Sequence, residues 1–401
     1  MSTVNIGQQI ENPVDSLYNW VLKNQYYGWD IYDGLNSPLT QKITNPYLRI
    51  LLLQINKYSP INMRKILKVK KGIDVKGIAL FAQSYATLYS VTGEEKYLSE
   101  MKKAIDFIKE KSLREKYGYD CWASHYYPYI TLGKSTLSVD VPDIIGTGQA
   151  TIALIKSYNI TKNSEEKDIA ISAAEFIVNE LFQNDDKYPF FAYSKSDDNP
   201  KHITLNASAQ AMEALCALNI GDNEKYKSVC ESAAQTLIQT QNNDGSWDYS
   251  IHKDGSKKRT QLDFHQGYII DGLLAFLPHS HNKNEIIECI IKASDYYNNI
   301  MFRKDGRSYF RYPLAYPIDI HNQAQGIISF SKLTWLDNKY ADFAEKIINW
   351  TVCNMQDNSG YFYYQKWPFI TNKIPHMRWG QAWMMRALST YLEKSSGGFN
   401  D

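Results

Sequence analysis

The chain has 401 residues, with 44 basic and 43 acidic side chains and a formal net charge of +1. Nothing in this balance suggests a nucleic acid or an anionic membrane as a partner. A ligand with a few negative charges is still compatible with it, because a net sum does not reveal local patches. The length is sufficient to bury a large core.

The cysteines and the hydrophobic stretches of the sequence indicate in which cellular compartment the protein is expected. The five cysteines include no CxxC pair, which favours reduced thiols and a reducing environment. The N-terminus has neither a basic start nor an apolar run, so no signal peptide is expected. No stretch approaches the roughly 18 apolar residues of a membrane span. We therefore expect a cytoplasmic protein without a membrane span.

The first 73 residues predict a less regular helical region. Asn12 and Pro13 are expected to begin a helix that runs to about residue 22, because proline is tolerated in a first turn. A second helix is expected near residues 46–56. Ser59 and Pro60 resemble a cap and first turn, which predicts a short basic helix to about residue 68.

From residue 74 onward, apolar side chains at helical spacing predict pairs of helices. The expected ranges are 74–92 with 97–108, 145–158 with 165–183, 205–218 with 222–241, 264–277 with 283–301, 320–334 with 338–355, and a last helix over 378–393. The first helix of each pair is almost uncharged, as in 148–154, and the second carries Lys and Glu on one side, as in 165–180. This alternation is typical of buried and surface helices.

A repeat runs through these pairs. The segment Gln241–Trp247 (QNNDGSW) leads through a loop to a helix opening, and looser copies precede other openings. Taking Gly146, Asn206, His265, His321 and Arg378 as openings, successive copies are about 56 to 60 residues apart. Because neither end offers a polar capping repeat, we expect the array to close. The fold prediction is an all-α α/α toroid of six or seven helical hairpins. It would be a single domain over 1–401, with an N-terminal hairpin region at 1–73, regular repeats at 74–394 and a tail at 395–401.

The helix openings should converge on one end of the ring, where N-terminal amides favour anions. They carry carboxylates and imidazoles beside aromatic loops, and the chain has 30 Tyr and 9 Trp. Such a set suits general acid–base chemistry on a sugar. The candidate catalytic residues are Asp263, His265, Asp143, Asp319 and Asp33. The candidate substrate-binding residues are Trp29, Asp30, His125, Tyr126, Tyr127, Asn206, His321, Gln323, His376, Arg378 and Trp379.

Each candidate also has a structural interpretation. The three aspartates at helix openings suit N-caps, and the histidines suit hydrogen-bonded core residues. Arg378 suits either a structural ion pair or a bidentate clamp on a uronate or sulfate. No HExxH, P-loop, GxGxxG or GxSxG pattern is present, so neither a metal nor a cofactor is expected.

Two resemblances follow from particular segments. Gln241–Trp247 resembles the QxxDGxW repeat of terpene cyclases, which are α/α toroids, but their DxDD acid motif is missing. A wider likeness, over about 32–391, rests on the segments 32–38, 76–81, 244–247 and 263–268. It is to a poorly characterised family encoded with polysaccharide biosynthesis genes, whose members resemble six-hairpin glycosidases. This resemblance implies glycan chemistry and supplies no catalytic residues.

We therefore predict a carbohydrate-active enzyme of cell-surface polysaccharide biosynthesis or processing, with a saccharide or glycosyl-lipid substrate. Glycoside hydrolysis is the preferred reaction, with lyase or epimerase action on a uronate next. One of the helix-opening aspartates would be the acid, and Asp33 would position water. The alternatives are a non-catalytic glycan-binding or scaffold protein and an isoprenoid-handling toroid. The oligomeric state is left open.

Overall fold

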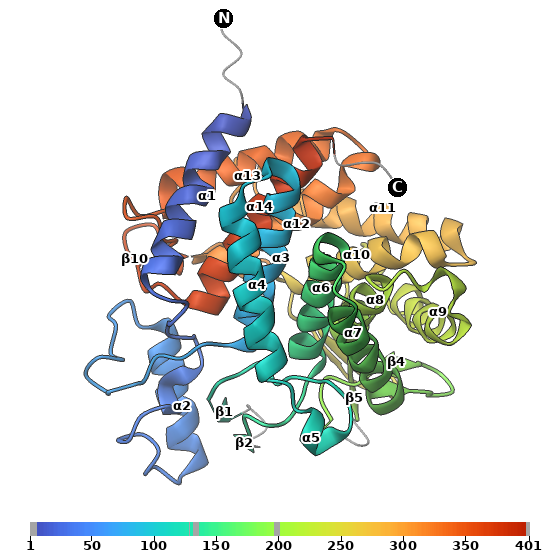
Figure 1. The fold of residues 1–401 in the computed structure, drawn as a ribbon, viewed down its shortest axis with the longest axis horizontal. Coiled ribbons are helices and arrows are strands. Elements are labelled where there is room, and N and C mark those ends of the chain that lie inside the picture. The colour runs from blue at the N-terminus through green and yellow to red at the C-terminus, as the bar shows by residue number, and fades with distance from the viewer. Residues whose placement is uncertain (1–5, 128, 131–135, 196–200, 398–401) are drawn as a thin grey trace, which may run out of the picture.

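A computed structural model describes residues 6–127, 129–130, 136–195 and 201–397. Its helices form a double ring, with six inner helices each packing against the next (Figure 1). The inner helices are α3 (Val75–Thr92), α6 (Ile144–Thr161), α8 (Leu205–Cys216), α10 (His265–Phe276), α12 (Ile320–Lys332) and α14 (Trp383–Ser395). Because α14 packs against α3, the ring is closed, and the described residues form six hairpins rather than seven.

Six more helices form the outer layer. They are α1 (Ile6–Lys23), α4 (Glu95–Glu110), α7 (Ser164–Phe176), α9 (Glu224–Gln239), α11 (Lys283–Ile300) and α13 (Lys339–Met355). The expected difference in charge appears as a difference in burial: Ile144–Ile155 of α6 are all buried, whereas α7 buries one side. Helix α1 packs against α14 and so supplies the outer helix of the last hairpin.

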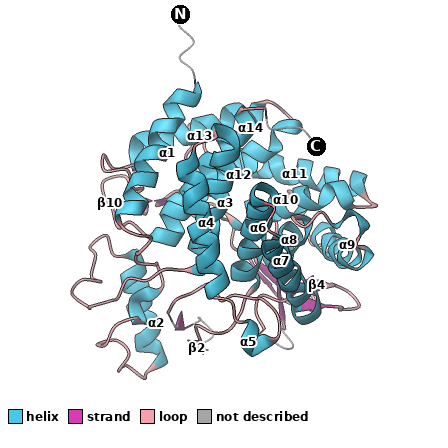
Figure 2. Ribbon diagram, in the orientation of Figure 1, coloured by secondary structure: helices cyan, strands magenta, loops and turns pink. Residues whose placement is uncertain are grey.

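The remaining helical elements are short or lie outside the ring. They are α2 (Pro46–Tyr58), α5 (Arg114–Tyr117), the 3-10 turns Asp33–Leu35, Ile220–Asp222, Leu277–His279 and Leu333–Trp335, and the π-turns Ile177–Leu181 and Met377–Ala382. Among the described residues, the strands lie in the loops between helices, and all are short (Figure 2). They are β1 (Tyr129–Ile130), β2 (Thr136–Leu137), β3 (Phe182–Gln183), β4 (Phe190–Phe191), β5 (His202–Thr204), β6 (Ser250–His252), β7 (Lys258–Arg259), β8 (Ile318–Asp319), β9 (Gln365–Lys366) and β10 (Thr371–Asn372).

The strands of the described residues pair antiparallel, some within one loop and some between two loops. Their spatial orders are β1-β2, β3-β4, β5-β6-β7 and β10-β9-β8. Ile203 lies opposite Ile251, and Asp319 lies opposite Gln365. The two three-stranded sheets each join the loops that precede two neighbouring inner helices, so they fix parts of the rim on which the helix openings lie.

A repeated clamp joins each Gly turn to the inner helix that follows it. Gln266 accepts a hydrogen bond from the Trp247 amide and donates one to the Trp247 carbonyl, both at 2.8 Å. Gln381 makes the same two hydrogen bonds with the amide and the carbonyl of Phe362, at 2.8 and 2.9 Å. The sequence repeat thus encodes a packing unit.

The Gly turns also seat the next outer helix. Gly245 has φ +92° and would place a Cβ 2.3 Å from the Lys292 carbonyl of α11. Gly360 has φ +106° and would place one 2.1 Å from the Ser16 carbonyl of α1. The last copy therefore closes the outer ring onto the first helix, and only glycine fits such close approaches.

Two expectations for the N-terminal region are wrong. The first helix begins at Ile6, not residue 12, and contains Pro13. Residues 61–68 form turns rather than a helix, because Ser59 and Asn62 bond the nearby amides of Ile61 and Arg64. The Arg64 side chain is drawn inward to Asp33, a tertiary contact that overrides local propensity. Of the expected tail, 398–401 lies outside the described residues, and Ser395 ends α14.

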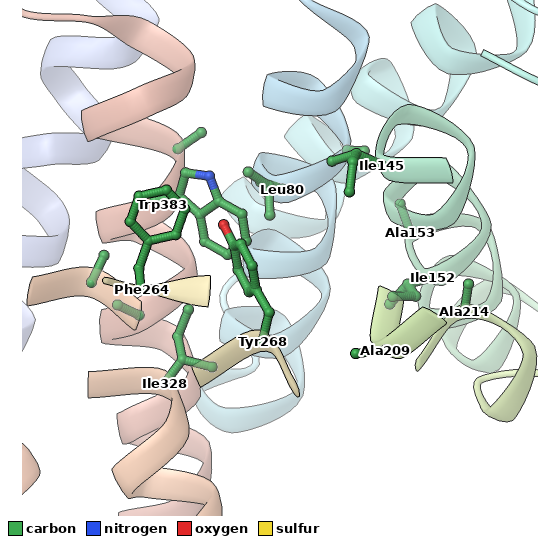
Figure 3. Close-up of a cluster of buried hydrophobic side chains, with 14 of the residues drawn as sticks. Leu80, Ile145, Ile152, Ala153, Ala209, Ala214, Phe264, Tyr268, Ile328 and Trp383 are labelled. Atoms are coloured by element: carbon green, nitrogen blue, oxygen red, sulfur yellow. The ribbon is translucent and has the colours of Figure 1, made fainter. Parts of the chain in front are cut away.

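The ring axis is filled rather than open. Phe264, Tyr268 and Trp383 pack between the inner helices with Leu80 and Ile328 (Figure 3). No helix among the described residues is long and apolar enough to cross a membrane.

Candidate active site

Three side chains distant in sequence meet at the N-terminal end of the inner ring. Arg378, in the π-turn before α14, donates from Nε and Nη2 to the two oxygens of Asp30, at 2.8 and 2.7 Å. The Asp74 carboxyl, which caps α3, has Oδ2 3.5 Å from the same Nε. All three side chains are buried. The Tyr127 hydroxyl also donates to Asp30.

The two carboxyl groups beside Arg378 are held in different protonation states. Burial favours the neutral form of Asp30, but the Arg378 charge and hydrogen bonds hold its pKa well below the usual range. Burial raises the pKa of Asp74 to about 7, and Arg378 offsets this only in part. One group is therefore an anion and the other a proton donor near neutral pH, a division typical of acid–base sites.

Lys76 brings a second cation into the same region. It is buried in the first turn of α3, with Nζ 5.3 Å from the centroid of the Trp383 ring. Burial and the Arg378 charge lower its pKa, while Asp74, Asp143 and Asp30 act in the opposite direction. Lys76 therefore lies among three carboxyl groups, although it forms no ion pair with any described residue.

Asp143 and His125 form the neighbouring part of the site. Asp143 caps α6 and accepts from Ser124 Oγ at 2.6 Å and from the Gly146 amide at 2.7 Å. Burial raises the pKa of the Asp143 carboxyl, and these hydrogen bonds oppose the shift. Burial lowers the pKa of His125 to about 3, so its imidazole is neutral.

Two small cavities open between these groups. One, of about 10 Å³, is lined by residues that include Trp29, Asp30, Asp74, Tyr126 and Arg378. The other, of about 20 Å³, is lined by residues that include Ser124, His125 and Asp143. Each has room for about one water molecule. A sugar ring can therefore enter only if side chains at this end of the ring move apart.

Aromatic rings lie beneath the charged groups. Phe264 stacks between His265 and His321, with a centroid distance of 4.2 Å to each. His321 Nε2 lies 2.6 Å from the Tyr268 hydroxyl, and the centroids of the His321 and Trp379 rings are 4.3 Å apart. Figure 3 shows Phe264 and Tyr268 together with Trp383. Burial holds the pKa of His321 well below its usual range, so it is neutral.

Asp263 and His265 form a separate dyad. The Asp263 carboxylate lies 2.5 Å from His265 Nδ1 and also accepts from Gln261 at 2.7 Å. The His265 side chain remains 14% exposed, which leaves the dyad at the edge of the site. Asp263 thus orients an imidazole that solvent can reach.

Three predicted site residues have structural partners instead of open space. Asp33 is fully buried against Arg64, with Nε at 2.7 Å, and also accepts from the Asp30 amide. Asp319 caps α12 and accepts from Gln365 and from Trp379 Nε1. Gln323 accepts from the Ser308 amide and donates to Gly306 and Thr351, which is the Gln clamp of its repeat.

The other predicted residues are divided between the site and the core. Trp29 and Tyr126 line the first cavity, and Tyr127 supports Asp30. Asn206 is buried in the first turn of α8. His376 is buried against Tyr364, and neither ring nitrogen has a hydrogen-bond partner among the described residues.

Asp74 and Lys76 lie at this site but were not among the residues predicted from the sequence. Both carried a usable signal: an Asp at a helix opening, as at the three chosen openings, and a Lys in an inner helix that is otherwise nearly uncharged. Tyr268 and Trp383 were also missed, because aromatic residues inside an apolar helix do not differ in pattern from the core. Among the described residues, no cluster of three His, Cys, Asp or Glu is placed to hold a metal ion.

Comparison with known proteins identifies the architecture. No protein-family model matches the chain, and no curated protein matches its sequence. Among solved structures, an unsaturated glucuronyl hydrolase specific for heparin matches 97% of both chains, with a TM-score of 0.63 and 13% identity. A cellobiose 2-epimerase from Bacillus thermoamylovorans matches 81% of this chain and 90% of its own, with a TM-score of 0.64 and 15% identity.

A third structure, an α-1,6-mannanase from Salegentibacter, matches 96% of this chain and 99% of its own, with a TM-score of 0.61 and 13% identity. These matches confirm the α/α toroid and its likeness to six-hairpin glycosidases. At such low identity they show the fold alone, and chemistry must be argued from the side chains.

Proposed function

We propose that this protein is a carbohydrate-active enzyme whose reaction takes place at the N-terminal end of the inner ring. The observation that carries the proposal is the convergence of Asp30, Asp74 and Arg378, with Lys76 beside them, next to aromatic side chains. Glycan-acting enzymes among the structures that share the fold support the same class.

Glycoside hydrolysis is the reaction that these groups suit best. Asp74 Oδ1 accepts from the Gly77 amide, whereas Oδ2 has no hydrogen-bond partner among the described residues. Protonated Oδ2 would donate its proton to the glycosidic oxygen as the bond to the anomeric carbon breaks. Asp143, beside the second cavity, would take a proton from the attacking water. The products are a free reducing sugar and the alcohol of the leaving group.

Asp30 and Arg378 would act as positioning residues. Their bidentate pair keeps Asp30 ionised and fixes the guanidinium beside Asp74. The Asp263–His265 dyad would contact the sugar from the edge of the site. Asp33, expected to position water, pairs with Arg64 and lines neither cavity, whereas Asp143 lines the second, so Asp143 replaces it in that role.

The alternative functions fit the site less well. An isoprenoid would meet two buried cations and three carboxyl groups, which are costly neighbours for an apolar chain. Epimerisation by two histidines would need both imidazoles to face one carbon, but Phe264 stacks between His265 and His321. A pure glycan binder has no use for a carboxyl group held protonated near neutral pH.

The test is turnover by wild type and Asp74→Asn against neutral and uronate-containing glycans, measured as release of reducing ends. Asparagine also caps helices well, so the variant should fold. We expect a loss of about 10²- to 10⁴-fold in kcat/KM, the usual contribution of a general acid. Asp357→Asn, in the Gly turn that precedes the last inner helix, is the matched control. Full activity in Asp74→Asn would contradict the proposal.

A further inference from the structure

Helix α2 lies outside the ring (Figure 1). It presents an apolar stripe to solvent. Its exposed side chains recur on one side of the helix and are 38% to 63% exposed. They are Tyr47, Leu48, Leu51, Ile55 and Tyr58. The opposite side, with Leu53 and Asn56, is buried. The stripe is therefore an unpartnered face of an otherwise anchored helix.

Two neighbouring segments also carry exposed apolar side chains. Ile61 and Ile66, in the turns after α2, are 68% and 67% exposed. The β9–β10 hairpin carries Phe369, 99% exposed, and is tied to the end of α2 by the Asn372 side chain, which donates to the Ser59 carbonyl at 2.9 Å. A contiguous exposed patch of large apolar side chains usually marks an interaction site.

The same segment has a strong local charge. Residues 34–73 contain eight Lys and Arg and no Asp or Glu, which the net charge of the chain conceals. Lys57 and Arg64 are buried, and Arg49 is half-buried. Five exposed lysines remain, and none forms an ion pair with a described residue: Lys42, Lys65, Lys68, Lys70 and Lys71. We name the stripe, the two neighbouring segments and these lysines the basic apolar surface.

We propose that the basic apolar surface docks on membranes that contain anionic lipids. The apolar side chains would enter the boundary between headgroups and acyl chains, and the lysines would contact lipid phosphates. A second copy of this chain fits less well. A two-fold interface places a patch against itself, so it would bring two sets of five lysines together with no acidic residue of 34–73 to neutralise them.

The surface adjoins the candidate active site. Lys71 Nζ lies 4.8 Å from the Trp29 ring, and Arg64 donates to the Asp30 carbonyl at 2.7 Å. A docked molecule would thus hold the N-terminal end of the ring near the bilayer. The test of docking does not depend on the proposed catalysis, because vesicle binding is measured without a glycan.

The test is co-sedimentation of the full chain with vesicles of phosphatidylcholine alone or mixed with phosphatidylglycerol, at low and high salt. We expect binding to the anionic vesicles only, weakened by salt. Leu51→Glu with Ile55→Glu should reduce partitioning by about tenfold or more. Lys65→Glu and Lys68→Glu should each reduce it by about fivefold or more, since one basic residue near the surface contributes about that factor.

Matched controls separate docking from general surface effects. Ile291→Glu, at an exposed position of α11, and Lys283→Glu, at its first residue, should bind as wild type does. Circular dichroism melting checks that every variant folds. Absence of binding to anionic vesicles, or unchanged binding by the α2 variants, would overturn the proposal. So would a dimer in light scattering that Leu51→Glu and Ile55→Glu dissociate.

Discussion

Asp30 and Asp74 both lie beside Arg378, but their carboxyl groups differ in protonation state because their distances to the guanidinium differ. Asp30 makes two short hydrogen bonds to it and remains ionised, whereas Asp74 lies 3.5 Å away and is dominated by burial. A shift of one pKa unit corresponds to about 1.4 kcal/mol of differential stabilisation. Small changes in geometry at Arg378 would therefore exchange these roles.

The pH dependence of activity tests this assignment. With a pKa of about 7, Asp74 is protonated below neutrality and loses its proton above it. We therefore expect kcat/KM to fall about tenfold per pH unit above that pKa. An acidic limb should report ionisation of Asp143, whose pKa is also raised. A rate that increases through neutral pH would contradict the role of Asp74 as the acid.

Ionisation of Asp74 should also make the free energy of unfolding depend on pH. The change should run in the opposite direction to that of a carboxylate held in an ion pair. The folded-state pKa of Asp74 is raised, so its contribution to the free energy of unfolding is complete below about pH 4, the pKa of an unfolded Asp. It is lost as pH rises through about 7. Asp74→Asn should therefore gain stability relative to wild type above pH 7, as seen in thermal melts.

Local chemistry determined some of the helix boundaries. Asp143 and Asp319 cap α6 and α12 as their positions suggested, because a carboxylate at a helix opening satisfies free amides. The segment after Ser59 did not form a helix, because its conformation depends on the distant pair of Arg64 and Asp33. Such a tertiary contact leaves no periodic signal.

The Gln clamps show why residue roles were harder to predict than helices. Gln323 and Gln266 occupy equivalent places at helix openings, and a polar side chain there suits either ligand binding or backbone support. Only the structure shows that each amide is used on a Gly turn.

Gln266→Ala tests the clamp as an element of the repeat. The substitution leaves the buried amide and carbonyl of Trp247 without their partners, so we expect the free energy of unfolding to fall by about 2–4 kcal/mol. Gln239→Ala, at the exposed end of α9, should change it by less than about 0.5 kcal/mol. Denaturant titrations measure both values. Equal stability of the two variants would show that the clamp contributes nothing.

At the scale of the molecule, closure of the ring follows from the repeat and from its first helix. Gln356 donates to the Pro13 carbonyl of α1, just as Gln241 donates to the Cys289 carbonyl of α11. The first and last parts of the chain thus complete one hairpin. The sequence indicated an array with alternating helices, but it could not separate six hairpins from seven, because α1 precedes the regular repeats.

The two ends of the ring differ in what they offer a ligand. The N-terminal end of the inner helices holds the Asp30–Arg378 pair and the water-sized cavities. The C-terminal end has a larger cavity of about 350 Å³, lined by residues that include Trp335, Asn338 and Tyr391. Cavity size alone would favour the C-terminal end as the site for a sugar, whereas the chemistry of the side chains favours the N-terminal end.

The most direct measurement is a crystal structure of Asp74→Asn grown with an oligosaccharide that the wild-type enzyme cleaves. We expect a glycosidic oxygen within hydrogen-bond distance of the substituted side chain at position 74, with aromatic side chains moved apart to admit the sugar ring. An oligosaccharide found only in the cavity beside Trp335, with the Arg378 end of the ring unchanged, would contradict this expectation.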